Sequence, residues 1–174
     1  MIFHRTNING VYNIELSSTE DERGSFIRFF CHKEYAKNDI EFNPIQMNRS
    51  FNIYSNTLRG IHIQKEPHAE AKVIQCIRGS IFDVVVDLRE NSPTYLKWEG
   101  FELNTATKSS LFIPAGLAHG FITTTPNTEI EYLMSEYYAP ESATGIRWDD
   151  PKIGINWPCK PKIISDKDAS WSLL

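Results

Sequence analysis

Two histidines in short apolar segments, His62 and His119, are the side chains of this sequence most capable of chemistry. His62 lies in residues 57–64 (TLRGIHIQ), and His119 follows a tight turn in residues 114–121 (PAGLAHGF). An imidazole has a reference pKa of about 6.5, so it can exchange protons near neutral pH, and its neutral form can bind a transition metal. A lone histidine in a strand is more often a hydrogen-bonded structural residue, so either chemical interpretation needs further support.

The metal interpretation is disfavoured by a missing ligand. A Pro-x-Gly turn that leads into a strand opening with histidine resembles the second characteristic box of the cupins, which are small double-stranded jelly rolls. The first cupin box would supply His-x-His, but this sequence has His62-Ile63-Gln64. Because three protein ligands are the usual minimum at a catalytic metal site, we expect no metal here. A metal-dependent cupin dioxygenase or isomerase stays as an alternative.

Short runs with alternating apolar residues recur along the chain and predict an all-β fold. Turn signals such as Arg23-Gly24, Arg78-Gly79 and Pro126-Asn127 separate them. Many short strands at this spacing are typical of a sandwich, jelly roll or barrel. The predicted strands are residues 11–16, 25–31, 45–51, 57–64, 72–77, 81–88, 97–103, 111–113, 120–124 and 129–135.

Helix is predicted only in residues 33–38 and in the tail, residues 166–174. The chain has neither GxGxxG nor GxxxxGK[ST], so a doubly wound nucleotide-binding fold is disfavoured. No linker or internal repeat divides the sequence. We therefore expect one domain over residues 1–174, a double-stranded β-helix (the jelly roll of cupins) with short peripheral helices.

Strict alternation within residues 57–64 also predicts which side chains share a face of that strand. One face would carry Arg59, Ile61 and Ile63, and the other Leu58, Gly60, His62 and Gln64.

Composition and charge exclude several classes of function. The 174 residues are 41% hydrophobic, 23% charged and 12% aromatic, which is typical of a globular protein and favours strands. The net charge of −4 comes without any long block of like charges, so we expect neither a nucleic-acid partner nor a membrane partner. Three cysteines without CxxC spacing, and an amino terminus without an apolar secretory segment, predict a cytoplasmic protein.

Nearly the whole chain resembles the RmlC-type epimerases, the dTDP-4-dehydrorhamnose 3,5-epimerase family, which are metal-free cupins. The matching segments are DERGSF (21–26), QMN (46–48), LRGIHIQ (58–64), KV (72–73), GSIFDVVVDLR (79–89), SPT (92–94), IPAGLAHGF (113–121), Tyr132, YYAP (137–140), IRWDDP (146–151), INWP (155–158) and SDKD (165–168). The resemblance implies an isomerase that inverts C3, C5 or both in a dTDP-4-keto-6-deoxyhexose, in the dTDP-rhamnose pathway.

The resemblance implies four catalytic residues and no cofactor. His62 would remove a proton next to the C4 ketone, with Asp168 fixing its tautomer and stabilising the imidazolium. Tyr132 would donate a proton from the opposite face of the sugar. Lys72 would stabilise the developing enolate oxygen, a contribution of order two to four kcal/mol in a dry pocket.

The resemblance further implies that substrate is bound by Arg23, Arg28, Gln46, Asn48, Arg59, His119, Tyr138 and Lys167. Among these, Arg59 and His119 would hold the diphosphate and sugar hydroxyls, and Tyr138 would stack on the base. The family typically forms a homodimer with swapped amino-terminal strands, which would carry Arg23 and Arg28 into the neighbouring subunit's pocket.

Arg28 departs from the family pattern RGxFxExF, in which a glutamate stands at this position. An acceptor of hydrogen bonds is thereby replaced by a donor. A second contact that is commonly acidic, near Ala143, is also missing. These departures motivate an alternative within the class, a 3-, 5- or 3,5-epimerase of a GDP-heptose or CDP-deoxyhexose 4-keto sugar. A sugar-binding module without catalysis is the alternative from another class.

Overall fold

The computed structural model describes residues 1–174 as thirteen strands and two short helices. The strands are β1 (Ile2–Arg5), β2 (Tyr12–Glu15), β3 (Ser18–Asp21), β4 (Gly24–Ile27), β5 (Gln46–Asn52), β6 (Leu58–Gln64), β7 (Lys72–Arg78), β8 (Ser80–Asp87), β9 (Trp98–Asn104), β10 (Ser109–Ile113), β11 (Leu117–Thr123), β12 (Thr128–Met134) and β13 (Ala143–Gly145), and the helices are α1 (His32–Ala36) and α2 (Asp166–Ala169). Neither helix is long and apolar enough to cross a bilayer.

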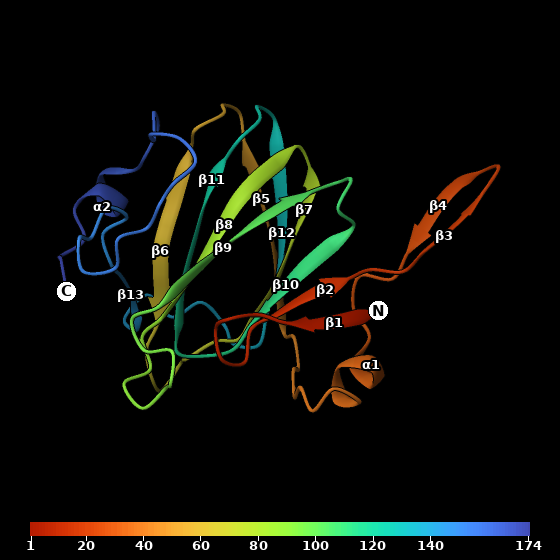
Figure 1. The fold of residues 1–174 in the computed structure, drawn as a ribbon, viewed down its shortest axis with the longest axis horizontal. Coiled ribbons are helices and arrows are strands. Elements are labelled where there is room, and N and C mark those ends of the chain that lie inside the picture. Colours follow the sequence, from red (N-terminus) through yellow and green to blue (C-terminus); the bar gives the residue numbers. More distant parts are fainter.

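Two antiparallel sheets face each other and confirm the predicted jelly roll (Figure 1). One sheet has the order β1-β2-β10-β7-β12-β5, and the other has the order β13-β6-β11-β8-β9. Strands that follow one another in sequence often lie in different sheets, as β6 and β7 or β10 and β11 do. This alternation is the pattern of a jelly roll and brings side chains from both sheets into one interior.

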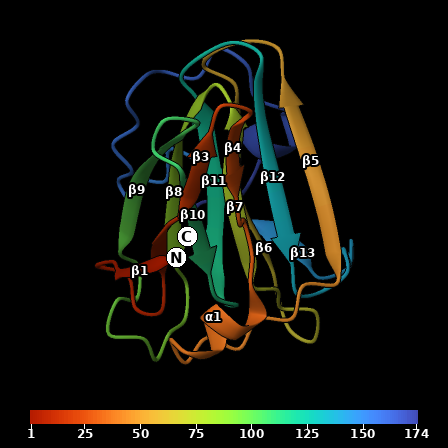
Figure 2. The same ribbon diagram turned by 90° about the vertical axis from the view of Figure 1, so that its right-hand side faces the viewer.

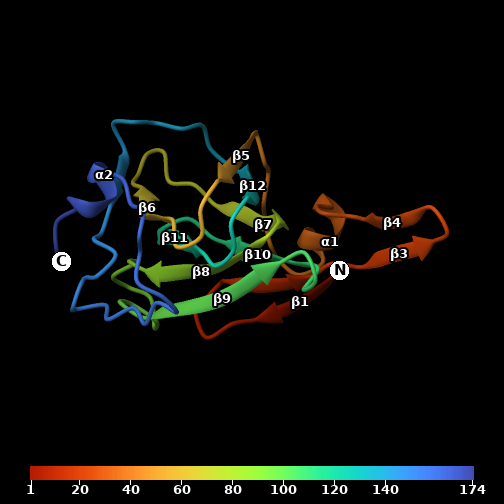
Figure 3. The same cartoon turned by 90° about the horizontal axis from the view of Figure 1, so that it is seen from above.

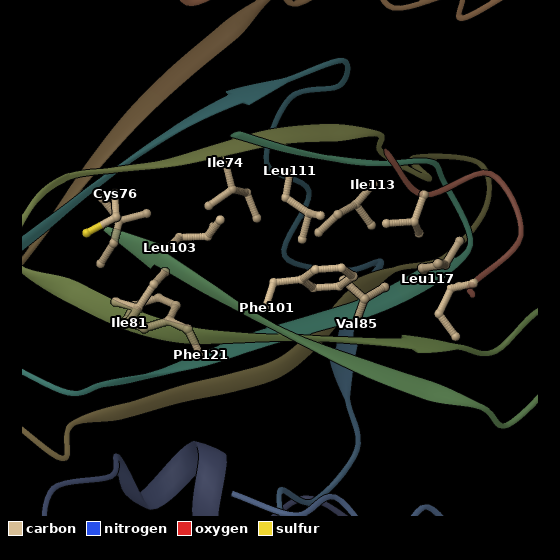
Figure 4. Packing of buried hydrophobic residues seen from close by; sticks show 13 residues of the cluster. Ile74, Cys76, Ile81, Val85, Phe101, Leu103, Leu111, Ile113, Leu117 and Phe121 are labelled. Atoms are coloured by element: carbon tan, nitrogen blue, oxygen red, sulfur yellow. The ribbon is translucent and has the colours of Figure 1, made fainter. Parts of the chain in front are cut away.

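Apolar side chains from both sheets fill the space between them (Figure 4). Ile74 and Leu111 come from the six-stranded sheet, and Val85 and Phe121 come from the five-stranded sheet. All four side chains are almost completely buried. Their burial is the main source of stability for this sandwich, because it removes large apolar surfaces from water.

Each sheet is also covered on its outer face. Helix α1, at the lower end of Figure 2, contributes Tyr35 to an aromatic cluster with Phe42 and Phe112 on the six-stranded sheet. Carboxy-terminal loops place Ile146 and Ile153 on the five-stranded sheet. Strands such as β11 are therefore buried on both faces, which explains their continuous apolar sequence.

The prediction that side chains alternate strictly along residues 57–64 is wrong at one point. His119 of β11 pairs with His62 of β6, but Phe121 pairs with Arg59, so β6 holds one extra residue between these pairs. This bulge turns Arg59 and His62 toward the same cavity, although alternation would place them on opposite faces. Gly60 permits the close approach, because it has φ = 131° and a Cβ there would lie 2.6 Å from the Cα of Gly120.

Other differences from the predicted elements lie at the periphery. The predicted strand at 25–31 ends at Ile27 and belongs to a separate hairpin, β3–β4, which projects from the body in Figure 1. Strands β1, β3 and β13 were not predicted, because each is only three or four residues long. The tail is helical only over Asp166–Ala169.

Candidate functional site

A cavity of about 620 Å³ opens between the two sheets, where β5 and β12 face β6 and β13. It is lined by ten of the twelve site residues predicted from the sequence: Gln46, Asn48, Arg59, His62, Lys72, His119, Tyr132, Tyr138, Lys167 and Asp168. These residues are scattered from position 46 to position 168, and the jelly roll brings them together. Its volume lies within the range of about 300 to 1,000 Å³ that is usual for pockets that bind small molecules.

His62 is bound to a carboxylate from the other end of the chain. Its Nε2 lies 2.6 Å from Oδ1 of Asp168, which belongs to α2. Helix α2 runs beside β6 in two perpendicular views (Figures 1 and 3). Because Nε2 faces the carboxylate, Nδ1 is the ring nitrogen left free for a proton.

Local structure holds Asp168 in place for this contact. The Ser165 hydroxyl caps α2 by accepting a hydrogen bond from the Asp168 backbone N–H, and the Gly60 N–H donates to Oδ2 of the Asp168 carboxylate at 3.2 Å. Burial by itself raises the pKa of this carboxyl, but the hydrogen bonds and charge of His62, together with the Gly60 N–H, hold the pKa below its ordinary value. Asp168 is therefore a charged partner for His62 at neutral pH.

A second histidine–carboxylate pair lies deeper in the cavity wall. Nε2 of His119 is 2.7 Å from Oδ2 of Asp83, and the Asp83 side chain has no exposed surface. Burial raises the pKa of Asp83, against the opposing charges of His119 and Lys72. Asp83 was not predicted as a site residue, although an aspartate in the apolar run of β8 is a signal for a buried polar partner.

Lys72 is also held by a carboxylate that was not predicted. Its Nζ lies 2.7 Å from Oε1 of Glu70, and the two side chains are 6% and 10% exposed. Both residues line the cavity. A nearly buried ammonium needs such a partner, because an unpaired charge in this environment would be costly. Glu70 lies in a loop, where no sequence pattern distinguished it.

Tyr132 projects from β12 of the six-stranded sheet toward His119, with the two rings edge to face at 6.5 Å. Burial raises the pKa of the Tyr132 phenol well above its usual range, and the Asp83 charge adds to this shift, while the Arg59 charge opposes it. The phenol is consequently protonated at any pH near neutrality.

Arg59 is oriented by an amide. The Arg59 Nε donates a hydrogen bond of 2.8 Å to Oδ1 of Asn52, a buried residue at the end of β5. Asn52 in turn donates to the Thr128 carbonyl at 3.3 Å. The remaining guanidinium nitrogens of Arg59 are free to bind an anion, for which the planar donor fork is well suited.

Polar and aromatic groups form the mouth of the cavity. Gln46 donates from Nε2 to Oδ1 of Asn48 and accepts at Oε1 from the Tyr138 N–H, both at 3.3 Å. The Tyr138 residue is 60% exposed. An exposed aromatic side chain beside amide groups can stack on a flat ligand whose edge the amides recognise.

The carboxy-terminal segment contributes two more groups beside His62. The Lys167 ammonium lies 5.4 Å from the ring centre of Trp171, and the Trp171 ring meets His62 edge to face at 6.4 Å. Lys167 was predicted from the sequence, whereas Trp171 was missed because a single aromatic residue in a polar tail carries no motif.

Arg23 and Arg28 do not reach this cavity within the chain. Arg23 lies in the projecting β3–β4 hairpin, is paired with Asp21, and has a side chain that is 86% exposed. The Arg28 guanidinium is likewise directed elsewhere, since its Nη1 lies 2.9 Å from Oε1 of Glu34. Neither arginine lines the cavity of its own subunit, and their role in substrate binding stays a prediction that places them in the neighbouring subunit's pocket.

Gln64 occupies the position of the second histidine in the His-x-His cupin box, and both ends of its amide form hydrogen bonds. The nitrogen donates to the carbonyls of His68 and Tyr137, and the oxygen accepts from the Ala139 N–H. Gln64 therefore anchors loops at the cavity rim. The structure groups no three His, Cys, Asp or Glu side chains in a metal-binding arrangement.

Comparisons with known proteins agree on one family. A family model described as dTDP-4-dehydrorhamnose 3,5-epimerase matches residues 5–174. The dTDP-4-dehydrorhamnose 3,5-epimerase of Sinorhizobium fredii is 42% identical over 171 residues, which cover 98% of this chain and 88% of that protein.

Solved structures are similar over almost the entire chain. The dTDP-4-dehydrorhamnose 3,5-epimerase of Bacillus anthracis, crystallised with TDP and PPi bound, has a TM-score of 0.96 at 36% identity and covers 99% of both chains. ChmJ, a 3'-monoepimerase from Streptomyces bikiniensis in complex with dTDP-quinovose, has a TM-score of 0.91 at 31% identity and covers 98% of this chain and 86% of that one.

Proposed function

This chain belongs to the dTDP-4-dehydrorhamnose 3,5-epimerase family, and from this premise we propose that it inverts C3 and C5 of a dTDP-4-keto-6-deoxyhexose in the dTDP-rhamnose pathway. The observation that carries the proposal is the 2.6 Å contact between His62 and Asp168 in a cavity that Lys72 and Tyr132 also line. These four groups supply a base, its charged partner, a cation and an acid, which suffice for epimerisation next to a ketone.

The first step would be proton removal by His62. The C–H bonds at C3 and C5 are acidic because both carbons flank the C4 carbonyl. Nδ1 of His62 takes the proton, the electron pair of the C–H bond forms a double bond to C4, and the π electrons of the C4 carbonyl move to its oxygen to give an enolate. Asp168 accepts the Nε2–H of the resulting imidazolium and stabilises its charge. Lys72 provides the positive charge for the enolate oxygen.

The second step would be proton return from the opposite face. His62 stands on the five-stranded sheet and Tyr132 on the six-stranded sheet, so a sugar ring between the sheets is approached from two sides. The phenol gives its proton to the enolate carbon, and the new C–H bond lies opposite the one that was broken. The product is the inverted ketone. Before the next turnover the His62 imidazolium releases its proton to solvent and the Tyr132 phenolate regains one.

The nucleotide would occupy the mouth of the cavity. Arg59 suits the diphosphate, and Tyr138 with Gln46 and Asn48 suits the base. The relatives named above are dTDP-sugar enzymes or bind TDP, which supports dTDP over the GDP and CDP alternatives. Arg28, which motivated those alternatives, is already neutralised by Glu34 within its own subunit.

We also infer a homodimer with exchanged hairpins. The β3–β4 hairpin pairs only with itself and exposes 73% of Phe26, while β5 is a free sheet edge with exposed Met47 and Phe51. Both features are typical of surfaces that a partner covers. In such a dimer, Arg23 of each subunit would be carried to the other subunit's cavity. A monomer in sedimentation at micromolar concentration would contradict this inference.

A cytoplasmic location is proposed from the thiols. Cys31, Cys76 and Cys159 are all free, which suits a reducing compartment. Cell fractionation with a tagged chain would test it.

Solvent exchange tests the proposed reaction directly. The purified protein is incubated with dTDP-4-keto-6-deoxyglucose in D₂O, and proton NMR follows the signals at C3 and C5. We expect deuterium at both carbons with the wild-type protein and none with His62→Ala. Exchange at neither carbon with folded wild-type protein would exclude the reaction, and exchange at C3 alone would identify a monoepimerase.

A further inference from the structure

Trp171 occupies a space that the sheet leaves open next to His62. Strand β13 pairs with β6 so that Gly145 lies directly opposite His62. Gly145 has no side chain, and a Cβ there would come within 2.6 Å of Cε2 and 2.7 Å of Nε1 of the Trp171 indole. The indole therefore packs directly on the backbone beside His62 and fills the site that a larger residue at position 145 would take.

The His62 ring is otherwise weakly constrained. Its side chain is 46% exposed, and its one hydrogen bond is to Asp168. A single hydrogen bond leaves an imidazole free to rotate about its own bonds and to exchange that partner for water. The Trp171 ring meets the His62 ring edge to face, with ring centres 6.4 Å apart and 71° between planes. This contact restricts rotation of the imidazole on one side.

Asp168 and Trp171 come from one short segment, so both contacts to His62 depend on the same turn. The Ser165 hydroxyl fixes this turn by accepting the Asp168 N–H. The face of the indole is used as well, because the Lys167 ammonium lies over it at 5.4 Å. The indole thus contacts both His62 and Lys167 in the wall of the cavity.

Trp171 is not a residue of the apolar core. Nε1 of Trp171 is buried without a hydrogen-bond partner, which costs free energy that a phenylalanine would avoid. The side chain also lies at the cavity and not in any of the three apolar clusters of the protein. Its position is accounted for by its contacts with His62 and Lys167.

We propose that Trp171 is a positioning residue that keeps the His62 imidazole in its hydrogen bond with Asp168, so that Nδ1 points into the cavity. The proposal rests on the proposed function in so far as His62 is the base. It adds a residue that acts on the reaction through His62 and not through contact with the reacting carbons.

The test compares two substitutions at this position. Trp171→Leu removes the aromatic ring, whereas Trp171→Phe keeps a smaller aromatic ring without the unpartnered N–H. We expect Trp171→Leu to lower kcat for deuterium wash-in about tenfold with KM changed less than about threefold, since only part of a general base's contribution is lost. Trp171→Phe should recover most of kcat.

A matched control separates positioning from loosening of the carboxy-terminal region. Trp157 lies in the same region, donates its N–H to the Trp148 carbonyl and does not line the cavity. Trp157→Leu should therefore leave kcat within about twofold in the folded protein. An equal loss in Trp157→Leu and Trp171→Leu, or an effect of Trp171→Leu on KM alone, would overturn the proposal.

A spectroscopic measurement keeps the proposal testable apart from turnover. Long-range ¹H–¹⁵N spectra of the imidazoles report which ring nitrogen of His62 carries the proton. We expect a single Nε2–H tautomer in the wild type and in Trp171→Phe, and a mixture in Trp171→Leu. An unchanged His62 spectrum in Trp171→Leu would refute the positioning role, whereas absence of wash-in by the wild type would refute the proposed function alone.

Discussion

His62 and His119 are paired directly across strands β6 and β11, yet each binds a different carboxylate. Asp168 reaches His62 from the carboxy-terminal segment, and Asp83 reaches His119 from the neighbouring strand β8. The pKa of Asp168 is lowered and that of Asp83 is raised, because the second carboxyl is the more deeply buried. Two similar pairs on one sheet are therefore electrostatically different, and only the His62 pair combines exposure with a fixed negative charge.

Asp168→Asn should abolish most of the base strength of His62. The amide can still accept a hydrogen bond, but it carries no charge to stabilise the imidazolium. We expect the rate of deuterium wash-in to fall about 100-fold or more. Asp166→Asn, on the exposed side of the same helix, is the matched control and should keep the wild-type rate. Retention of a third of the rate by Asp168→Asn would show that the charge at this position is not used.

Tyr132→Phe should separate the two halves of the reaction. Proton removal by His62 does not need the phenol, so some wash-in continues, whereas formation of the inverted sugar falls about 100-fold. Because burial raises the pKa of Tyr132, the wild-type phenol keeps its proton as the pH rises, and it should cause no loss of activity below about pH 10. Product stereochemistry by NMR is the measurement. Tyr137→Phe, exposed and outside the cavity, should behave as wild type.

Asp87 should make the fold sensitive to acid. Burial raises the pKa of this carboxyl, but hydrogen bonds from Arg89, Ser92 and Thr94 outweigh it and lower the pKa to about 2. A lowered pKa means that the stabilisation is present above the unfolded-state pKa and is lost as the pH falls through the folded-state value. It amounts to about 2 kcal/mol and disappears between about pH 4 and pH 2.

Urea unfolding at several pH values measures this contribution. Asp87→Asn should lower the free energy of unfolding by about 2 kcal/mol at pH 7 and by much less near pH 2. An equal loss at both pH values would show that packing, and not charge, makes Asp87 important.

The fold was largely predictable, because nine of the ten short alternating runs fall on strands of the jelly roll and the tenth falls on the β3–β4 hairpin. Alternation failed at the Gly60 bulge, where pairing with β11 decides the face of Arg59 and His62. Such a bulge depends on contacts between distant strands, which periodicity along one strand does not contain.

The candidate site was predictable where a motif or the family resemblance singled out a residue. Asp83, Glu70 and Asn52 were missed, because each acts by holding another side chain and not by a pattern of its own. The position of Arg23 was unpredictable for a different reason. Its place depends on the direction in which the β3–β4 hairpin leaves the sandwich, and alternation within the hairpin carries no signal for that direction.

The nucleotide selectivity of the cavity mouth can be measured from the shift in Tm that each nucleotide causes. A ligand that binds only the folded state raises its stability by mass action, so dTDP at 100 times its Kd adds about 2.7 kcal/mol and raises Tm by about 5 °C or more. GDP and CDP should give smaller shifts at equal concentration, since the proposed substrate is a dTDP sugar. Arg59→Ala should reduce the dTDP shift through loss of a diphosphate contact, and Tyr138→Ala through loss of stacking. Arg5→Ala, which removes a cation far from the cavity, should leave the dTDP shift unchanged. A larger shift with GDP or CDP than with dTDP would instead support an epimerase of another nucleotide sugar.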